Sequence, residues 1–305
     1  MDTLLQQLIN GLVLGAVYAL VALGYTMVYG ILGLINFAHG EVVMVGALTA
    51  LAVIKPLAGL HPALQLAAGL AVAIPVCMAL GAGIERVAYR PLRNAPRLAP
   101  LITAIGVSIV LQYSVVLIWG RSYHAYPELL PTTPFNLGGA RISPAQIAII
   151  VFSALVMAGL LWLVHRTRLG RAMRATAENP AVARLMGVNV NSVVTMTFVI
   201  GSALGAMAGV LVSINYSVVH YQMGFMLGLK AFTAAVLGGI GNLGGAMVGG
   251  LLLGLIEALG SGYVGDLTGG VFGSNYRDVF AFIVLIVVLI FRPSGLLGER
   301  VAERA

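Results

Sequence analysis

RTRLGRAMRATAENPAVARLMGVNVN, residues 166–191, is the stretch that decides how this chain folds. It carries five arginines and lies between two apolar runs that are each long enough to cross a bilayer. An arginine at the centre of a bilayer costs roughly 2.5–3.5 kcal/mol, so this stretch must stay in water between two spans. Because arginine and lysine are enriched in the cytoplasmic loops of membrane proteins, we predict that residues 166–191 are cytoplasmic.

Composition places the rest of the chain in the membrane. Of its 305 residues 60% are hydrophobic and 9% are charged, whereas soluble domains carry about 25% charged residues. The net charge of +7 does not indicate nucleic-acid binding, because four, five and three of the 17 basic residues fall in residues 86–97, 166–184 and 292–304. Anionic lipid headgroups are a sufficient partner for such cytoplasmic segments. The sequence therefore predicts a multi-pass membrane protein that contacts lipids and binds no nucleic acid.

The apolar runs predict an all-α fold, a polytopic membrane helical bundle of about eight to nine spans, with some helices broken or re-entrant. We expect a single domain over residues 1–305, with residues 120–144 as an irregular external loop rich in proline and glycine. The candidate spans are residues 4–29, 31–54, 63–84, 98–119, 145–164, 193–214, 225–237, 246–263 and 279–291.

The side of the amino terminus stays open at this point. Nine full spans would put it outside, and a re-entrant pair in place of one span would put it inside. The start MDTLLQQ has no basic region before its apolar run, so we interpret it as the start of a first membrane helix rather than a cleaved signal peptide.

Glycines repeat every four residues at two places in the chain, at 201, 205 and 209 and at 241, 245 and 249. In a membrane this spacing lets helix backbones approach closely, so a tightly packed bundle is expected. The run Gly239-Ile-Gly-Asn-Leu-Gly244 matches the dinucleotide-binding fingerprint formally, but that motif requires a preceding strand and a following acidic residue. We interpret it as a tight turn between two membrane helices.

A small set of polar residues falls inside the apolar runs, where ionisable groups are costly and mark functional sites or internal pairs. In residues 36–41 the combination of asparagine, histidine and glycine is typical of a broken helix whose new amino terminus places Glu41 in its first turn. One interpretation is structural, with Glu41 and Lys230 forming a buried pair; the other is direct contact with a transported molecule. The candidates for the translocation pathway or its gate are Asn36, His39, Gly40, Glu41, Lys230, Thr233 and Glu257.

The sequence contains no motif of a nucleotide-binding, metal-binding or hydrolase site. Its two lysines, Lys55 and Lys230, complete no phosphate-binding loop, so ATP-driven transport would need another polypeptide. No histidine lies at metal-ligand spacing, and no serine or cysteine lies in a hydrolase motif. We therefore predict no catalytic residue, no metal and no cofactor.

Residues 166–191 themselves read as a basic helical segment that breaks near Asn179, restarts at Pro180 and stops at Gly187. Asn191 and Ser192 are the expected caps of the next span. A short capped helix on the cytoplasmic surface either anchors in the lipid headgroups or presents a contact surface to a partner protein.

Several stretches together resemble the inner-membrane permeases of bacterial branched-chain amino acid ABC importers, over nearly the whole chain. The NFAHGE motif is similar to the shorter of the two permease types that these importers pair. The stretches are YTMVYGILGLINFAHGEVVMVGA at 25–47, IERVAYRPLR at 84–93, GRAMRATAENPAVARLMGVN at 170–189 and LKAFTAAVLGGIGNLGGAMVGGLLLGLIEAL at 229–259.

The resemblance implies a transport subunit without its own ATPase, not an enzyme, in the bacterial inner membrane. Its implied partners are a second homologous permease, two cytoplasmic ATPases and a periplasmic binding protein that delivers leucine, isoleucine or valine. The residues implied to couple to the ATPases are Arg174, Glu178, Pro180, Ala181, Ala183 and Gly187. They are similar to the EAA…G pattern of ABC permeases, although Asn179 and Pro180 interrupt the spacing.

Two other functions remain open on these residues. Relatives that carry urea or short-chain amides are similar in sequence, so the substrate is less fixed than the family. The buried ionisable residues Glu41, Lys230 and Glu257 would also suit an ion-coupled secondary transporter.

Overall fold

The computed structural model describes residues 2–298, except residues 94, 97, 132, 138 and 268–275. The described chain is helical, with four short strands. The helices are α1 (Asp2–Leu32), α2 (His39–Ile54), α3 (Pro62–Ile84), α4 (Leu98–Trp119), α5 (Pro144–Arg166), α6 (Arg168–Glu178), α7 (Pro180–Leu185), α8 (Val190–Tyr216), α9 (Met223–Gly238), α10 (Leu243–Leu267) and α11 (Arg277–Phe291). The strands are β1 (His124–Ala125), β2 (Phe135–Leu137), β3 (Ala140–Ile142) and β4 (Val218–Val219).

Seven of the described helices are long and apolar enough to cross a membrane, and two shorter apolar helices accompany them, at Met223–Gly238 and Phe282–Phe291. The prediction of a polytopic membrane helical bundle is therefore confirmed. The second predicted span was wrong at its start, because residues 33–38 are not helical and α2 begins only at His39.

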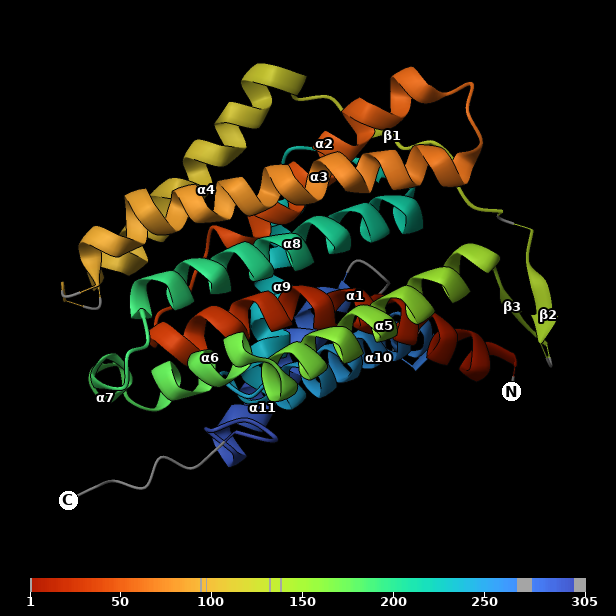
Figure 1. Ribbon diagram of the computed structural model, residues 1–305. Helices are drawn as coiled ribbons and strands as arrows, with labels where there is room; N and C mark the ends of the chain where they lie inside the picture. Colours follow the sequence, from red (N-terminus) through yellow and green to blue (C-terminus); the bar gives the residue numbers. More distant parts are fainter. Residues whose placement is uncertain are drawn as a thin grey trace.

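The core lies around α1, α2 and α8, while α3, α4 and α5 form the periphery. In α1, 89% of the most apolar window is buried, against 17% in α4. Figure 1 shows α1 and α9 in the middle of the bundle, with α3 and α4 along its upper edge and α5 on its near side. The exposed apolar faces of the peripheral helices suit a lipid solvent.

Glycines bring the core helices together, as their spacing predicted. A Cβ atom added to Gly15 of α1 would lie 2.8 Å from Leu251 Cα of α10, and one added to Gly11 would lie 2.8 Å from Leu255 Cα. On α8, Gly209 similarly lies against the backbone of Val43 in α2. These contacts confirm close helix packing through small residues.

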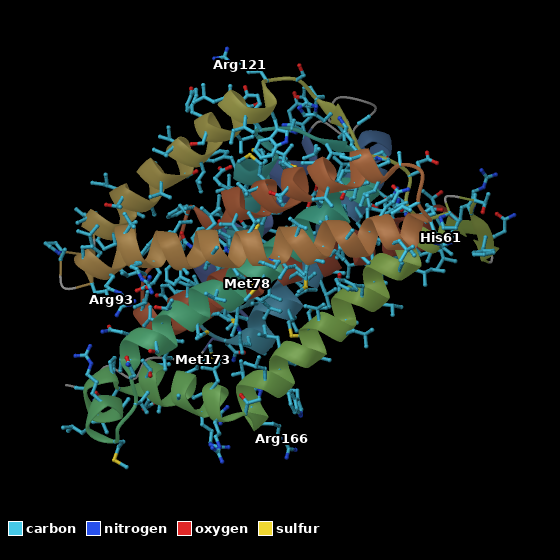
Figure 2. All side chains as sticks on the ribbon, turned by 45° about the horizontal axis from the view of Figure 1, so that its top comes forward. His61, Met78, Arg93, Arg121, Arg166 and Met173 are labelled. Atoms are coloured by element: carbon cyan, nitrogen blue, oxygen red, sulfur yellow. The ribbon has the colours of Figure 1, made fainter. Side chains whose placement is uncertain are left out.

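The two ends of the bundle differ. The end that holds α6 and α7 carries the arginine-rich segments and is called the arginine end below; the opposite end holds β1 to β4 and is called the loop end. Figure 2 shows Arg93 and Arg166 at the arginine end and His61 at the loop end.

The amino-terminal part of α1 lies at the loop end. The Gln6 amide donates to the Arg141 carbonyl at 3.0 Å and accepts from the Arg141 amide at 2.8 Å. The start of α1 therefore lies at the end of the bundle opposite residues 166–191 (Figure 1).

The loop of residues 120–144 is more ordered than expected. β2 and β3 form an antiparallel hairpin that pairs Phe135 with Ile142, and β1 pairs with β4 after α8. The pairing of β1 with β4 joins segments that are distant in sequence, which is why the prolines and glycines of the loop did not indicate it.

Two halves of the bundle have the same plan in opposite orientations. In each half a long helix, α1 or α8, is followed by a non-helical break at residues 33–38 or 217–222 and then by a 16-residue helix, α2 or α9. α1 packs along α10, and α8 packs along α3. Aligned end to end, α2 and α9 share Gly40 with Gly224, Ala47 with Ala231, Thr49 with Thr233 and Ala50 with Ala234. This arrangement is typical of inverted repeats in transporters.

Candidate functional site

The break between α1 and α2 has the form predicted from the sequence. α2 begins at His39, and Glu41 lies in its first turn. The Glu41 side chain is fully buried, and its Oε1 atom accepts hydrogen bonds from the Ser108 hydroxyl at 3.0 Å and the Gln112 amide at 2.7 Å. Both donors belong to α4, so Glu41 ties this peripheral helix to the core.

Asn36, His39 and Gly40 lie around the same break. The Tyr89 hydroxyl is 3.2 Å from Asn36 Oδ1. His39 is buried with its ring edge-on to Tyr25, and among the described residues its Nε2 atom has no hydrogen-bond partner. These side chains form a polar cluster inside the bundle.

Gly40 marks the place where the two halves meet. A Cβ atom on Gly40 would lie 2.8 Å from Gly228 Cα, and one on Gly224 would lie 2.6 Å from Glu41 Oε2. The amino-terminal turns of α2 and α9 therefore touch through their backbones. A larger side chain at this crossing would force the helices apart.

The predicted pair between Glu41 and Lys230 is wrong. Lys230 Nζ lies 2.8 Å from Glu257 Oε1 of α10 and 2.7 Å from Asp278 Oδ1 of α11. The Tyr18 hydroxyl of α1 donates to Glu257 Oε2 at 2.8 Å. Glu41 instead contacts α4, so Glu41 and Lys230 have different partners in the bundle.

Thr233, the remaining pathway candidate, is buried in α9, where its hydroxyl donates to the Leu229 carbonyl one turn earlier at 2.9 Å. Asp278 is the member of the Lys230 cluster that sequence reasoning missed. It lies just before the last predicted span. Because an acidic residue directly before an apolar run usually belongs to a loop, the sequence did not indicate that Asp278 is part of a cluster inside the bundle.

A second missed cluster lies at the arginine end, where α3 continues into a π-helical turn (Glu85–Tyr89) and a 3₁₀ turn (Arg90–Leu92). Glu85 is fully buried and forms ion pairs with Arg90, at 3.0 Å, and with Arg93. The Thr195 hydroxyl of α8 donates to Glu85 Oε2 at 2.8 Å. This cluster fastens the ends of α3 and α8 together.

Residues 166–191 fold as the sequence indicated. α6 ends at Glu178, and the Asn179 side chain caps α7 by accepting from the amides of Ala181 and Val182 at 3.0 and 3.1 Å. Gly187 follows with φ of +83°, a conformation that favours glycine. The cap of α8 is Asn189 rather than the predicted Asn191 and Ser192, because α8 starts one residue after Asn189.

The six predicted coupling residues do not all face outward. Arg174, Glu178, Pro180, Ala181 and Gly187 are exposed, whereas Ala183 of α7 is buried. Sequence reasoning passed over the most exposed apolar side chains of this segment, which are Val182 at 52%, Leu185 at 86% and Met186 at 79% exposure. The signal available was three apolar residues in a hydrophilic, arginine-rich segment.

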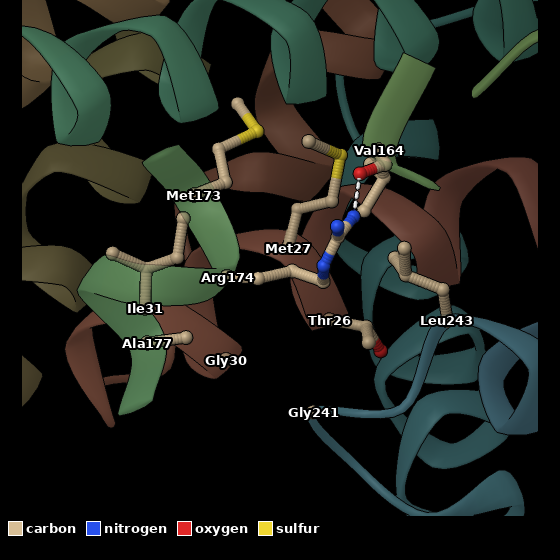
Figure 3. Close-up of a pocket in the computed structure, with 10 residues that line it drawn as sticks. All are labelled: Thr26, Met27, Gly30, Ile31, Val164, Met173, Arg174, Ala177, Gly241 and Leu243. Atoms are coloured by element: carbon tan, nitrogen blue, oxygen red, sulfur yellow. Dashed lines mark hydrogen bonds between the residues drawn. The ribbon is translucent and has the colours of Figure 1, made fainter. Parts of the chain in front are cut away.

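Arg174 is exposed, and its side chain contacts the carboxyl end of α5. Its guanidinium donates to the carbonyl of Val164 in the last turns of α5, across a pocket of about 100 Å³. Figure 3 shows the Arg174 side chain crossing this pocket, with Met27 on one side and Thr26 on the other. Arg174 therefore joins α6 to α5 and positions the segment.

Among the described residues, no group of three or more histidine, cysteine, aspartate or glutamate side chains is placed to hold a metal ion. The candidate functional features of the chain are a buried crossing of two broken helices and an exposed short helix at the arginine end.

Comparison with known proteins gives these features a context. Residues 7–289 match the family described as branched-chain amino acid transport system / permease component. This chain belongs to that permease family. The high-affinity branched-chain amino acid transport system permease protein BraD of Pseudomonas aeruginosa is 52% identical to it, covering 98% of this chain and 97% of BraD. The high-affinity branched-chain amino acid transport system permease protein LivH of Escherichia coli is 47% identical to this chain, covering 98% of this chain and 97% of LivH.

A more distant permease, the autoinducer 2 import system protein LsrC of Escherichia coli, is 28% identical over 63% of this chain and 55% of LsrC. No solved structure matches the chain. The family membership and the apolar helices together make this chain a multi-pass membrane permease.

Proposed function

We propose that this chain is one of two permease subunits of an ATP-driven ABC importer that carries leucine, isoleucine and valine across the bacterial inner membrane. The observation that carries this proposal is the identity of 52% and 47%, over 98% of the chain, to permeases named for high-affinity branched-chain amino acid transport. If ATP drives this transport, another polypeptide must bind it, because the sequence contains no phosphate-binding loop. A periplasmic binding protein and a second homologous permease complete the proposed assembly.

The exposed face of α7 is the proposed contact for an ATPase. Val182, Leu185 and Met186 present apolar surface at the end of the molecule where the arginines require water. Apolar patches exposed to water mark protein contacts or membrane contacts. We assign this one to a cytoplasmic ATPase, and insertion into the lipid headgroups is the alternative that the test on α7 in the Discussion separates from it.

The contacts around α7 connect it to α5 and α8, so a movement of α7 would move both of these helices. Arg174 fixes α6 to the carboxyl end of α5, and the chain passes from α7 through Gly187 into the Asn189 cap of α8. A push on α7 thus reaches α5 and α8 with one glycine as the flexible point. We propose that α8, packed on α2 and α3, passes it on as a rocking of one half against the other.

The crossing of α2 and α9 is the proposed centre of the pathway. A free amino acid is a zwitterion, so the path must shelter a carboxylate and an ammonium group. Helix amino termini favour carboxylates, and the first turns of both α2 and α9 meet at Gly40. Asn36, His39 and Glu41 provide neighbouring polar groups, whereas the Lys230 cluster holds α9, α10 and α11 in place.

Reconstitution tests this function. The chain would be purified with the products of its neighbouring genes, placed in proteoliposomes with internal ATP, and supplied with binding protein and labelled leucine. We expect uptake that requires ATP and is unaffected by an uncoupler. Uptake that survives without ATP and collapses with the uncoupler would establish a secondary transporter, and uptake of urea or an amide in place of leucine would reassign the substrate.

A further inference from the structure

A cavity of about 210 Å³ opens at the loop end between α1, α5, α8 and α10. It is separate from the pocket behind Arg174, which lies at the arginine end. Part of its wall is aliphatic, from Val13, Leu14 and Ala258. The polar side chains that line it are Gln7, Asn10, Gln146, Asn215, Tyr216 and Ser261.

The polar lining consists of amides and hydroxyls, with no charged side chain. Gln146 is used by the helix cap at Ser143, and Asn10 accepts from Gln6. The side chains of Gln7 and Asn215 form no hydrogen bond with any described residue. Each amide offers two N–H donors and an acceptor oxygen, so two complete sets of donors and acceptors remain for a ligand.

These features limit the ligand. A net charge would find no opposite charge on the wall, and burying it would be costly, so the ligand carries no net charge. It presents both donors and acceptors to the amides and an aliphatic group to Val13 and Leu14. A dry cavity of ~150 Å³ holds benzene, so this larger cavity admits a molecule somewhat bigger than benzene.

We propose that this cavity receives the substrate at the outer side of the permease, as a zwitterionic amino acid with an aliphatic side chain. The amide N–H groups face the carboxylate and the amide oxygens face the ammonium group. The proposal rests on the proposed function, which makes the loop end the outer end. Ala258 of the cavity wall follows Glu257 of the Lys230 cluster in α10.

Cysteine protection tests the site directly. Cys77 is the native cysteine of the chain and is buried, so an S261C variant gives a selective target for a membrane-impermeant thiosulfonate reagent on intact cells carrying the full importer. We expect millimolar leucine to slow modification at least about threefold and aspartate to leave it unchanged. N136C in the exposed hairpin is the control, whose modification leucine should not slow.

Three results of that experiment would overturn the inference. They are equal rates with and without leucine, equal protection by aspartate, and an S261C variant that resists modification while N136C reacts. The last result would show that a lipid headgroup or another permanent occupant fills the cavity.

Transport separates this inference from the proposed function. Asn215→Leu removes one free amide and fills the cavity, and Asn136→Leu is the same change outside it. At saturating binding protein we expect Asn215→Leu to reduce leucine uptake about tenfold or more, because hydrogen bonds to charged groups are lost, at unchanged thermal stability. If the wild-type importer does not carry leucine, the proposed function is wrong. If the wild type carries leucine and the Asn215→Leu variant is equally active, only the inference about the cavity is wrong.

Discussion

At the scale of single residues, the buried lysine of α9 shows how this bundle tolerates charge. Lys230 is surrounded by two carboxylates and a tyrosine hydroxyl contributed by α1, α10 and α11. A charge removed from water is tolerated when it is paired and hydrogen-bonded. The same cluster therefore holds four helices at one point, and its loss should loosen all of them.

The change Lys230→Met tests this role. It leaves Glu257 and Asp278 facing each other without a cation, and breaking a buried pair costs about 3–5 kcal/mol. We expect a clear drop in the thermal unfolding temperature of the purified complex. The matched control is Lys55→Met, which changes the exposed lysine at the end of α2; equal stability of the two variants would contradict the assignment.

Gly40 supports a second residue-scale prediction. A Cβ atom at this position would lie 2.8 Å from the backbone of Gly228, and overpacking of this kind typically costs about 1–3 kcal/mol. We expect Gly40→Ala to lower the unfolding temperature and the uptake rate. Gly106→Ala in α4 is the control, because a Cβ atom there would meet nothing within 4 Å; that change should be neutral or slightly stabilising.

At the scale of elements, α7 has well-defined capping residues and an exposed apolar face. Asn179, Pro180 and Gly187 define its ends by cap and turn chemistry that the sequence already displayed. Leu185 and the adjoining Met186 bury little of their surface against the described residues. Such a helix makes energetic sense when its apolar face is covered by another molecule.

Leu185→Asp is the direct test of that face. Because Leu185 is 86% exposed, we expect its replacement to change stability by less than about 0.5 kcal/mol. ATP hydrolysis stimulated by loaded binding protein should nevertheless fall at least about tenfold, since a desolvated aliphatic contact is replaced by a charge. The control is Leu297→Asp, at another exposed leucine of the arginine end. Normal stimulated hydrolysis in the Leu185→Asp variant, with weaker membrane anchoring of α7, would favour the headgroup interpretation.

Gly187 gives a prediction about how α7 is attached. Its φ of +83° disfavours any residue with a Cβ atom, and about 1–2 kcal/mol of strain is expected for a substitution. We expect Gly187→Val to leave the protein in the membrane but to abolish coupled ATP hydrolysis, because the link between α7 and α8 changes direction. Gly59→Val, in an open loop position without a positive φ, should retain coupling.

At the scale of the whole molecule, α1 with α2 and α8 with α9 have the same plan in opposite orientations. α1 starts beside the hairpin of β2 and β3 and reaches the arginine end, while α8 runs the opposite way. The halves touch at the glycine crossing of α2 and α9. Motion of one half relative to the other would open and close the path on either side of that crossing.

Accessibility of introduced cysteines tests this orientation, because the native Cys77 is buried. An impermeant thiol reagent added to spheroplasts should modify T3C and N136C at once, and M186C only after the membrane is permeabilised. Modification of M186C from outside would invert the whole assignment. A T3C variant that reacts only after permeabilisation would contradict the position of the amino terminus.

The parts of the molecule that the sequence predicted depend on local chemistry. Long apolar runs form helices that cross the bilayer because lipid cannot satisfy backbone polar groups. The break before His39 and the cap at Asn179 follow from residues within a few positions of each other. The arginines of residues 166–191 lie outside the long apolar helices for a local reason as well, since charge is excluded from hydrocarbon at each position separately.

Only the tertiary structure decided which of these local features meet. Lys230 pairs with Glu257 and Asp278 rather than Glu41, Ala183 is buried although it belongs to the otherwise exposed α7, and the start of α1 lies beside the hairpin of β2 and β3. Each of these outcomes depends on contacts between segments that are distant in sequence, such as the packing of α1 on α10. Such contacts are set by the fit of whole helix faces, which no single residue specifies.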